Sequence, residues 1–143
     1  MAVQTLYTAH ATATGGRNGH THNDDGLVDV QLSIPKSMGG PGKPGTTTPE
    51  DLFAAGYAAC FGSAAEYFAR QLKLFPSSLE VKAAVGIGWV PEGGFGLTVD
   101  LEVRVGGLSQ EDADRVVAAA DEGCPYSRAV RGNVPVTIKT LVV

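Results

Sequence analysis

Two stretches of alternating apolar and polar residues in the second half of the chain constrain the fold most. In residues 79–89 the odd positions are apolar and the even positions include Glu80 and Lys82. The same rhythm resumes in residues 97–105, after the turn sequence Pro-Glu-Gly-Gly. Period-two alternation is typical of strands with one buried face. The two runs predict a hairpin over 79–105 that packs on a core.

Further strands are predicted at both ends of the chain. Residues 28–34 alternate branched apolar residues with polar ones, and residues 3–13 begin with a valine and hold three threonines. Residues 1–35 are therefore expected to form an N-terminal hairpin, with its connection within 14–26. Residues 134–142 alternate again and predict a last strand, which must join a sheet formed earlier.

Two helices are predicted between these strands. The first is expected over 49–74, because Thr48 can cap it, a proline suits its first turn, and Pro76 prevents its continuation. The second is expected over 109–123, since a Ser-x-x-Asp pair opens it and a glycine stands where it stops. Its apolar positions fall on one stripe.

The segment 36–48 between strands and helix is an arm rich in glycine and proline. With its flanking prolines it holds four glycines and four prolines and has no periodic face. It is interpreted as a long loop or mobile arm. The order of elements predicts the α+β class, with antiparallel sheets packed around a long central helix. A chain of 143 residues with 43% hydrophobic residues suits a single domain over 1–143.

Composition excludes several classes of partner. The net charge is −4, with lysine and arginine scattered singly, so no basic stripe is available for nucleic acid. The most apolar stretch, residues 52–68, is interrupted by glycines, a serine and a glutamate, so no membrane span is expected. The first residues lack the pattern of a secretory signal, which predicts a cytoplasmic protein. In a reducing cytosol, a disulfide between the two cysteines would be transient and catalytic.

The two cysteines have different predicted settings. Cys60 lies in the middle of the first helix among small and aromatic residues, and a small core hydrophobe is one interpretation of it. Cys124 follows the second helix. If residues 125–131 form a short helix, Cys124 caps it with its sulfur near the positive end. A capping role without redox chemistry stays open for Cys124.

Arg17 and Glu50 are candidates for the charged part of a thiol site. A cysteine peroxidase needs a thiolate, a cation that keeps it ionised, a group that holds the cation, and a second thiol. Arg17 lies in a glycine-rich connection and Glu50 begins the long helix, although a solvated arginine and a glutamate that serves the helix dipole are the alternatives. Ten helical residues span about 15 Å and leave Glu50 about 80° around the axis from Cys60. Either the first turns bend away or Glu50 reaches the Cys60 of a second subunit, and we infer a homodimer interface.

His20 and His22 stand at alternate positions, where two imidazoles on one strand face could bind a metal. No third ligand is nearby and a turn sequence follows in residues 23–26. Solvated loop histidines are therefore the favoured interpretation, and no metal site is predicted.

Two segments resemble signature segments of a known family. They are Thr-Pro-Glu-Asp-Leu-Phe-Ala-Ala-Gly-Tyr-Ala-Ala-Cys-Phe at 48–61 and Cys-Pro-Tyr-Ser-Arg-Ala at 124–129. Together they are similar to the organic hydroperoxide resistance (Ohr) proteins of the OsmC superfamily. The resemblance extends over most of the chain through four further segments. They are the N-terminal Thr-Gly-Gly-Arg loop, the Asp-Gly-Leu-Val-Asp-Val-Gln-Leu-Ser strand, the Pro-Lys-x-x-Gly-Gly arm and the Arg-Gly-Asn-Val segment at 131–134.

The resemblance implies a function and a set of roles. It implies that Cys60 attacks an organic hydroperoxide, that Arg17 and Glu50 flank it, and that Cys124 resolves the oxidised product as a disulfide. It further implies an OsmC-like fold in an intertwined homodimer and an antioxidant role in the stress response. The implied reductant is an external dithiol, of the lipoyl type on a lipoylated protein, and no bound cofactor is expected.

Three aromatic residues near the thiols in sequence are candidates for substrate binding. Phe53, Phe61 and Tyr126 would favour an alkyl or lipid hydroperoxide, because the organic group gains burial. The alternatives are an OsmC-type peroxidase of broader substrate range, a hydrolase with a cysteine nucleophile, and a carrier of apolar ligands with inert cysteines.

Overall fold

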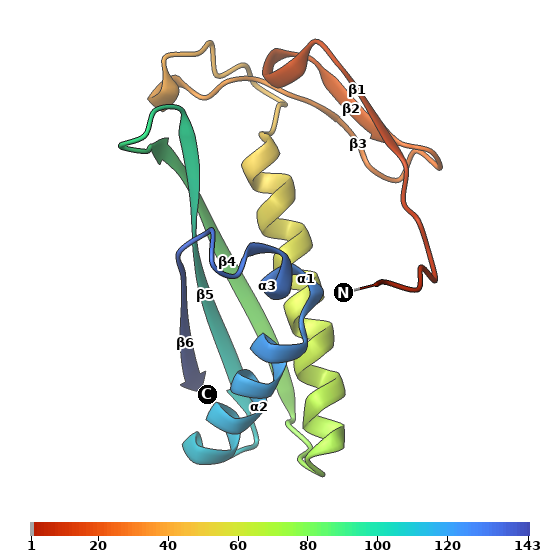
Figure 1. Cartoon of the computed structure of the whole chain (residues 1–143), viewed down its shortest axis with the longest axis vertical. Coiled ribbons are helices and arrows are strands. Elements are labelled where there is room, and N and C mark those ends of the chain that lie inside the picture. The colour runs from red at the N-terminus through yellow and green to blue at the C-terminus, as the bar shows by residue number, and fades with distance from the viewer. Residues whose placement is uncertain (1) are drawn as a thin grey trace. The chain divides into compact units, whose positions relative to one another are not determined.

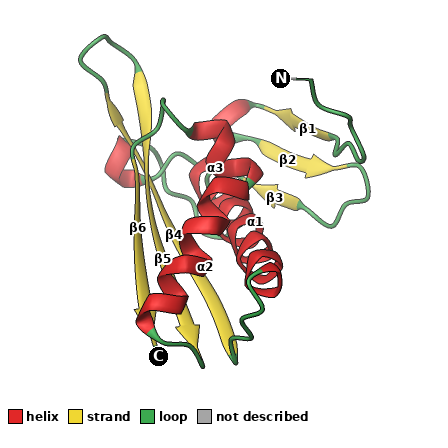
Figure 2. Cartoon of the chain, turned by 60° about the horizontal axis from the view of Figure 1, so that its bottom comes forward, coloured by secondary structure: helices red, strands yellow, loops and turns green. Residues whose placement is uncertain are grey.

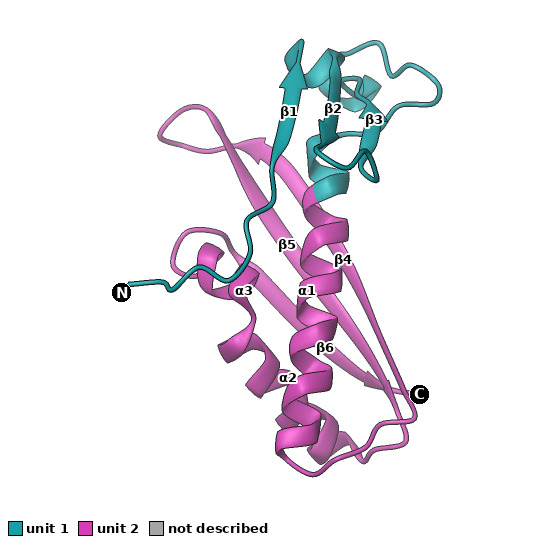
Figure 3. Cartoon of the chain, turned by 90° about the vertical axis from the view of Figure 1, so that its right-hand side faces the viewer, with its two compact units in different colours: residues 1–52 teal, residues 53–143 magenta. Residues whose placement is uncertain are grey.

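The computed structural model of the chain describes residues 2–143. The chain divides into two compact units, residues 1–52 and residues 53–143 (Figure 3). Along the chain, three short strands precede a long helix, a two-stranded hairpin, two further helices and a last strand (Figure 1). None of the described helices is long and apolar enough to cross a membrane. The assignment of the whole chain to a single domain stays a prediction.

The first unit holds a three-stranded antiparallel sheet in the order β1-β2-β3. Its strands are β1 (Ala11–Thr14), β2 (His20–Asn23) and β3 (Asp29–Gln31). The predicted N-terminal hairpin is therefore wrong, since β2 lies inside the segment taken as its connection. The reason is that β2 reads His-Thr-His-Asn and has no apolar alternation to mark it. The composition of residues 3–13 also overstated the first strand, which begins only at Ala11.

The arm after β3 is tied down by backbone hydrogen bonds. A 3-10 turn (Lys36–Met38) begins it, and the Gly42 N–H donates to the Ile34 carbonyl at 2.9 Å. Near its end the Thr47 N–H donates to the Gln31 carbonyl at 2.9 Å. The segment is a long loop, as one of the two interpretations has it, and its two ends are hydrogen-bonded to the β3 region. Its mobility stays a prediction.

Helix α1 (Pro49–Gln71) begins and ends with recognisable caps. The Asp51 N–H donates to the Thr48 hydroxyl at 3.1 Å, as the Thr-Pro-x-Asp sequence indicates. The helix ends three residues before the expected position. There Lys73 takes a left-handed conformation with φ of 57°, and the Leu74 N–H bonds back to the Ala69 carbonyl at 2.8 Å. The helix therefore stops through its own C-cap, before Pro76 is reached.

The sheet of the second unit has the order β4-β5-β6. Strands β4 (Ser78–Trp89) and β5 (Phe95–Gly106) form the antiparallel hairpin that the alternation indicates. Strand β6 (Val136–Val142) pairs with β5 in parallel, so the expectation of antiparallel sheets is wrong for this strand. The physical reason is the connection: residues 107–135 form a helical crossover, which brings the chain back along the same direction.

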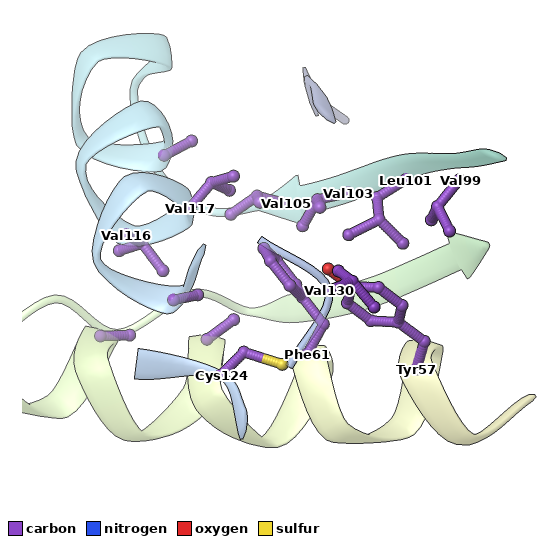
Figure 4. Packing of buried hydrophobic residues seen from close by; sticks show 14 residues of the cluster. Tyr57, Phe61, Val99, Leu101, Val103, Val105, Val116, Val117, Cys124 and Val130 are labelled. Carbon is purple, nitrogen blue, oxygen red and sulfur yellow. The ribbon is translucent and has the colours of Figure 1, made fainter. Parts of the chain in front are cut away.

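Three helices cover one face of this sheet (Figure 2): α1, α2 (Gln110–Gly123) and α3 (Pro125–Val130). The Ser109 hydroxyl accepts from the Asp112 N–H at 3.1 Å and caps α2, a contact that contributes roughly 0.5–2 kcal/mol. The core lies between helices and sheet (Figure 4) and consists mainly of side chains from α1, β5 and α2: Tyr57, Phe61, Ala65, Ala69, Val99, Leu101, Val103, Val105, Ala113, Val116, Val117 and Ala120.

Candidate functional site

Cys60 lies on α1 at the border of the helix face that packs on the core. Tyr57, Phe61 and Ala65 recur at every fourth position and are fully buried, so they fix the rotation of the helix. Cys60 precedes Phe61 and is half-buried. The side chain therefore has packing on one side and solvent access on the other, unlike a thiol that serves only as a core residue.

Cys124 occupies the junction between α2 and α3. It ends α2, where its N–H donates to the Ala120 carbonyl at 2.8 Å, and it precedes the first residue of α3. Its side chain is fully buried, and no hydrogen bond from it caps α3. The placement of Cys124 ahead of a short helix matches the expectation, whereas the sulfur is directed into the core (Figure 4).

The two sulfur atoms meet although 64 residues separate them in the chain. The Cys124 thiol donates a hydrogen bond to the Cys60 sulfur, with 3.7 Å between the two Sγ atoms, and both cysteines are reduced. A disulfide requires an S–S distance of about 2.05 Å, so the sulfurs must approach by about 1.7 Å. The two sulfurs are therefore neighbours that stand just beyond bonding distance.

The surroundings of Cys60 within the second unit favour its neutral form. Burial raises the pKa of the Cys60 thiol, since desolvation disfavours the thiolate. A backbone hydrogen bond with Tyr126 lowers the pKa in opposition, and the adjacent Cys124 thiol raises it again. Ionisation of Cys60 near neutral pH therefore requires a further positive group.

A cavity of about 360 Å³ opens beside Cys60. Its walls come from the solvent side of α1 and from the α2–α3 junction: Cys60, Ser63, Ala64, Tyr67, Phe68, Gly123 and Pro125. Gly123 permits the close approach of the Phe68 ring, because a Cβ atom there would stand 2.2 Å from Phe68 Cε2. The cavity presents two aromatic rings beside a thiol. Tyr67 and Phe68 follow from the helical spacing after Cys60, but sequence reasoning did not single them out.

The three aromatic residues predicted to bind substrate lie elsewhere. Phe61 is fully buried in the core, where its side chain meets no solvent. Phe53 and Tyr126 pack edge to face with ring centroids 6.2 Å apart, and Tyr126 is 40% exposed. None of these three residues lines the cavity beside Cys60. A role in substrate binding stays a prediction for Phe53 and Tyr126, while Phe61 acts as a core residue in this arrangement.

Arg17 and Glu50 form a two-pronged ion pair in the first unit. Arg17 Nη1 donates to Glu50 Oε2 at 2.9 Å, and Nη2 donates to Oε1 at 2.6 Å. Arg17 stands in a 3-10 turn (Gly16–Asn18) whose entry needs left-handed φ values of 79° at Gly15 and 61° at Gly16. The glycines thus let the turn direct the guanidinium at the carboxylate, as the proposed partnership of these residues requires.

The ion pair shifts the pKa values of both partners in the stabilising direction. The hydrogen bond from Arg17 holds the pKa of Glu50 below its ordinary value, and the bond to Glu50 raises the pKa of Arg17. For a carboxylate with a lowered pKa, the stabilisation is present above the ordinary value of 4.5 and is lost only as the pH falls through the lowered pKa. The pair therefore stays charged at neutral pH.

His20 and His22 lie on β2, so their assignment to a solvated loop is wrong. Their rings stack with centroids 5.4 Å apart, and His20 Nε2 contacts Asp29 Oδ1 at 2.5 Å. Within residues 2–143, no three histidine, cysteine or acidic side chains gather closely enough to hold a metal ion. The histidines thus belong to the sheet of the first unit.

Known proteins resemble this chain over most of its length. A protein-family profile described as OsmC-like protein matches residues 40–139. The organic hydroperoxide resistance protein of Xanthomonas axonopodis pv. citri is 49% identical over 134 residues, which are 93% of each chain. The organic hydroperoxide resistance protein OhrB of Bacillus subtilis is 44% identical over 135 residues, covering 94% of this chain and 97% of that one.

Solved structures agree with these relatives. A crystal structure of an organic hydroperoxide resistance protein from Legionella pneumophila superposes with a TM-score of 0.92 at 46% identity, covering 97% of this chain and all of the other. The structure of Bacillus subtilis OhrB gives a TM-score of 0.87 at 43% identity, with 95% and 99% coverage. The α+β class and the OsmC-like fold are thereby confirmed.

Proposed function

Since this chain belongs to the family of OsmC-like proteins and, within it, to the organic hydroperoxide resistance proteins, we propose that it is a thiol-dependent peroxidase. It reduces organic hydroperoxides to alcohols and so contributes to resistance against organic peroxides. The relatives carry this role in their names, and the reaction assigned to individual residues here is our proposal.

One observation carries the proposal: two reduced sulfurs with Sγ atoms 3.7 Å apart, one half-buried at a cavity and the other fully buried. A peroxide that enters the cavity meets Cys60 first, because Cys124 is shielded from solvent. Cys124 is close enough to react with oxidised Cys60 without unfolding. This order of access suits an attacking thiol and a resolving thiol.

In the first step the Cys60 thiolate attacks the outer oxygen of ROOH. A sulfur–oxygen bond forms, the O–O bond breaks, and the leaving alkoxide takes up a proton to give the alcohol. Cys60 is oxidised to a sulfenic acid while the peroxide is reduced.

In the second step the Cys124 sulfur displaces hydroxide from the sulfenic acid of Cys60. A Cys60–Cys124 disulfide forms, and the hydroxide leaves as water with the Cys124 proton. An external dithiol then reduces this disulfide by two exchange steps and becomes a disulfide itself. We propose a lipoyl-type dithiol, which family resemblance favours.

The cation for the thiolate is assigned to Arg17, with Glu50 as the residue that orients it. Arg17 also donates to the peroxide oxygens as charge develops on the leaving oxygen. Helix α1 is continuous from Pro49 to Gln71, and its geometry puts Glu50 and Cys60 about 15 Å apart along the axis. We therefore infer a homodimer in which the ion pair of one subunit serves Cys60 of the other.

Substrate preference tests the role of the cavity. Cumene hydroperoxide or a fatty-acid hydroperoxide is expected to react with a kcat/KM at least about tenfold above that of hydrogen peroxide, because an organic group gains burial against Tyr67 and Phe68. The measurement is steady-state peroxide consumption with a dithiol reductant. In the variant Phe68→Ala, kcat/KM should fall several-fold for cumene hydroperoxide and should stay within about twofold of wild type for hydrogen peroxide. Equal rates for organic and inorganic peroxide would refute the role of the cavity.

A further inference from the structure

Tyr57 carries a buried hydroxyl to which the proposed reaction assigns no role. The residue lies on α1 and is fully buried, and its hydroxyl meets the Ser127 hydroxyl at 2.7 Å. Ser127 belongs to α3 and is 3% exposed, the one buried polar side chain that the second unit places in its described core. A hydrogen bond between two buried hydroxyls is directional, and neither partner can replace it with water without movement.

The two ends of this bond lie beside the two sulfurs. Tyr57 precedes Cys60 by three residues on α1, about one helical turn. Ser127 follows Cys124 by three residues, and the Arg128 N–H bonds back to the Cys124 carbonyl at 3.0 Å, which makes this stretch one turn of α3. The bond therefore joins the two turns that carry the cysteines.

Other contacts near Cys124 constrain it less directly. Arg131 donates to the Asp121 carbonyl at 2.7 Å and to its carboxylate at 3.3 Å, but both residues belong to the α2–α3 segment. That pair fixes the shape of the segment but does not join the segment to α1. The rings of Tyr57 and Tyr126 lie 5.8 Å apart, a contact without a fixed direction.

The Tyr57–Ser127 bond is not tightly packed all round, and a cavity that neither cysteine lines borders it. The cavity has a volume of about 180 Å³ and is lined in part by Tyr57, Ser127 and Arg131. Packing around α3 is therefore incomplete on this side, although Cys124 and Val130 are buried in the core. The hydroxyl pair is one of the contacts that hold this six-residue helix and the cysteine before it against α1, beside the backbone hydrogen bond of Tyr126 to Cys60 and the packing of Phe68 on Gly123.

We propose that Tyr57 and Ser127 are positioning residues whose hydrogen bond holds Cys124 against Cys60, and so sets the rate and the equilibrium of disulfide closure. The inference deepens the proposed function, on which its kinetic part rests. Without the bond, α3 samples positions in which the sulfurs are farther apart, and the effective concentration of one thiol at the other falls. Attack on the peroxide by Cys60 needs no such positioning.

The test uses Tyr57→Phe and Ser127→Ala in the full chain. The first readout is the equilibrium of the Cys60–Cys124 disulfide with oxidised and reduced glutathione, which needs no peroxide. Closure consumes one oxidised glutathione and releases two reduced ones. Each variant is expected to lower the equilibrium constant about tenfold, which corresponds to a potential about 30 mV less negative. The double variant should have about the same equilibrium constant as either single variant, since both substitutions remove the same hydrogen bond.

The second readout is kinetic. With one equivalent of cumene hydroperoxide, oxidation of Cys60 should stay within about twofold of wild type, while disulfide formation slows about tenfold and excess peroxide produces sulfinic acid. The control is Val105→Ala, a truncation of a fully buried side chain in the same core, near the C-terminal end of β5 (Figure 4). This variant should lower the midpoint of urea unfolding without changing the rate or the equilibrium of disulfide formation.

The outcomes separate the two proposals. Wild-type closure and an unchanged glutathione equilibrium in folded Tyr57→Phe and Ser127→Ala would overturn the positioning role. An altered equilibrium in the variants, together with a wild type that peroxide does not oxidise, would leave the positioning role in place and contradict the peroxidase. The positioning role is also contradicted if Tyr57→Phe or Ser127→Ala slows disulfide formation no more than Val105→Ala does.

Discussion

Replacing Cys60 with serine is expected to lower kcat/KM for organic hydroperoxides by about 10⁴-fold or more, because a serine hydroxyl is neither ionised at neutral pH nor comparably nucleophilic toward peroxide. The fold should survive, since Cys60 is half-buried and serine is close to it in size. The measurement is consumption of cumene hydroperoxide with dihydrolipoamide as reductant. Residual turnover within tenfold of wild type would exclude Cys60 as the attacking group.

Cys124→Ser is the matched variant, and it separates the two roles. We expect one equivalent of peroxide to be consumed by Cys60 at near the wild-type rate, after which dithiol-dependent turnover stops and Cys60 is overoxidised. A cysteine-nucleophile hydrolase would keep its activity in this variant. A carrier of apolar ligands would show no oxidation in either protein. The three functions thus give three different results.

Arg17→Ala is expected to lower the rate of Cys60 oxidation by about 10²–10³-fold, the cost of removing a positioned donor from a developing charge. Burial raises the pKa of Cys60, so loss of the cation shifts the alkylation of Cys60 by iodoacetamide to higher pH. Arg17→Lys is the control: it keeps the charge but lacks the fork that bonds both Glu50 oxygens, and should recover only part of the rate. An alkylation profile that does not change in Arg17→Ala would contradict the role.

The same variant tests the dimeric site. Dimers of Arg17→Ala alone keep at most about a hundredth of the rate and dimers of Cys60→Ser still less, but a mixed dimer would hold one complete site if the ion pair serves the partner's sulfur. After random exchange at equal concentrations, half of the dimers are mixed and each has one working site of two. We therefore expect recovery of about a quarter of the wild-type rate. A site built within one chain would give no recovery.

The contacts between the candidate site residues were more predictable from the sequence than the arrangement of the strands. The pairing of Arg17 with Glu50 and the meeting of Cys60 with Cys124 both occur, and they join residues 33 and 64 positions apart. The two segments that resemble a known family contain Glu50, Cys60 and Cys124, and the similar Thr-Gly-Gly-Arg loop contains Arg17. The cavity walls at Tyr67 and Phe68 carry no such signature, and which aromatic rings face a thiol depends on the rotation of a helix.

The errors in the fold have a common cause. Apolar alternation detects strands with one buried face, so it found β4 and β5 but not β2, whose four residues are only partly buried. Alternation also does not indicate whether a strand runs parallel or antiparallel to its neighbour. The parallel pairing of β6 follows from the helical crossover before it. The C-cap of α1 depends on the left-handed conformation of Lys73, which the presence of a lysine does not predict.

The most direct test is mass spectrometry of the reduced protein after one equivalent of cumene hydroperoxide. The account predicts a mass loss of two hydrogens and a peptide crosslink between Cys60 and Cys124, both reversed by a dithiol. An unchanged mass, or oxygen added to Cys60 with Cys124 still alkylatable, would contradict it.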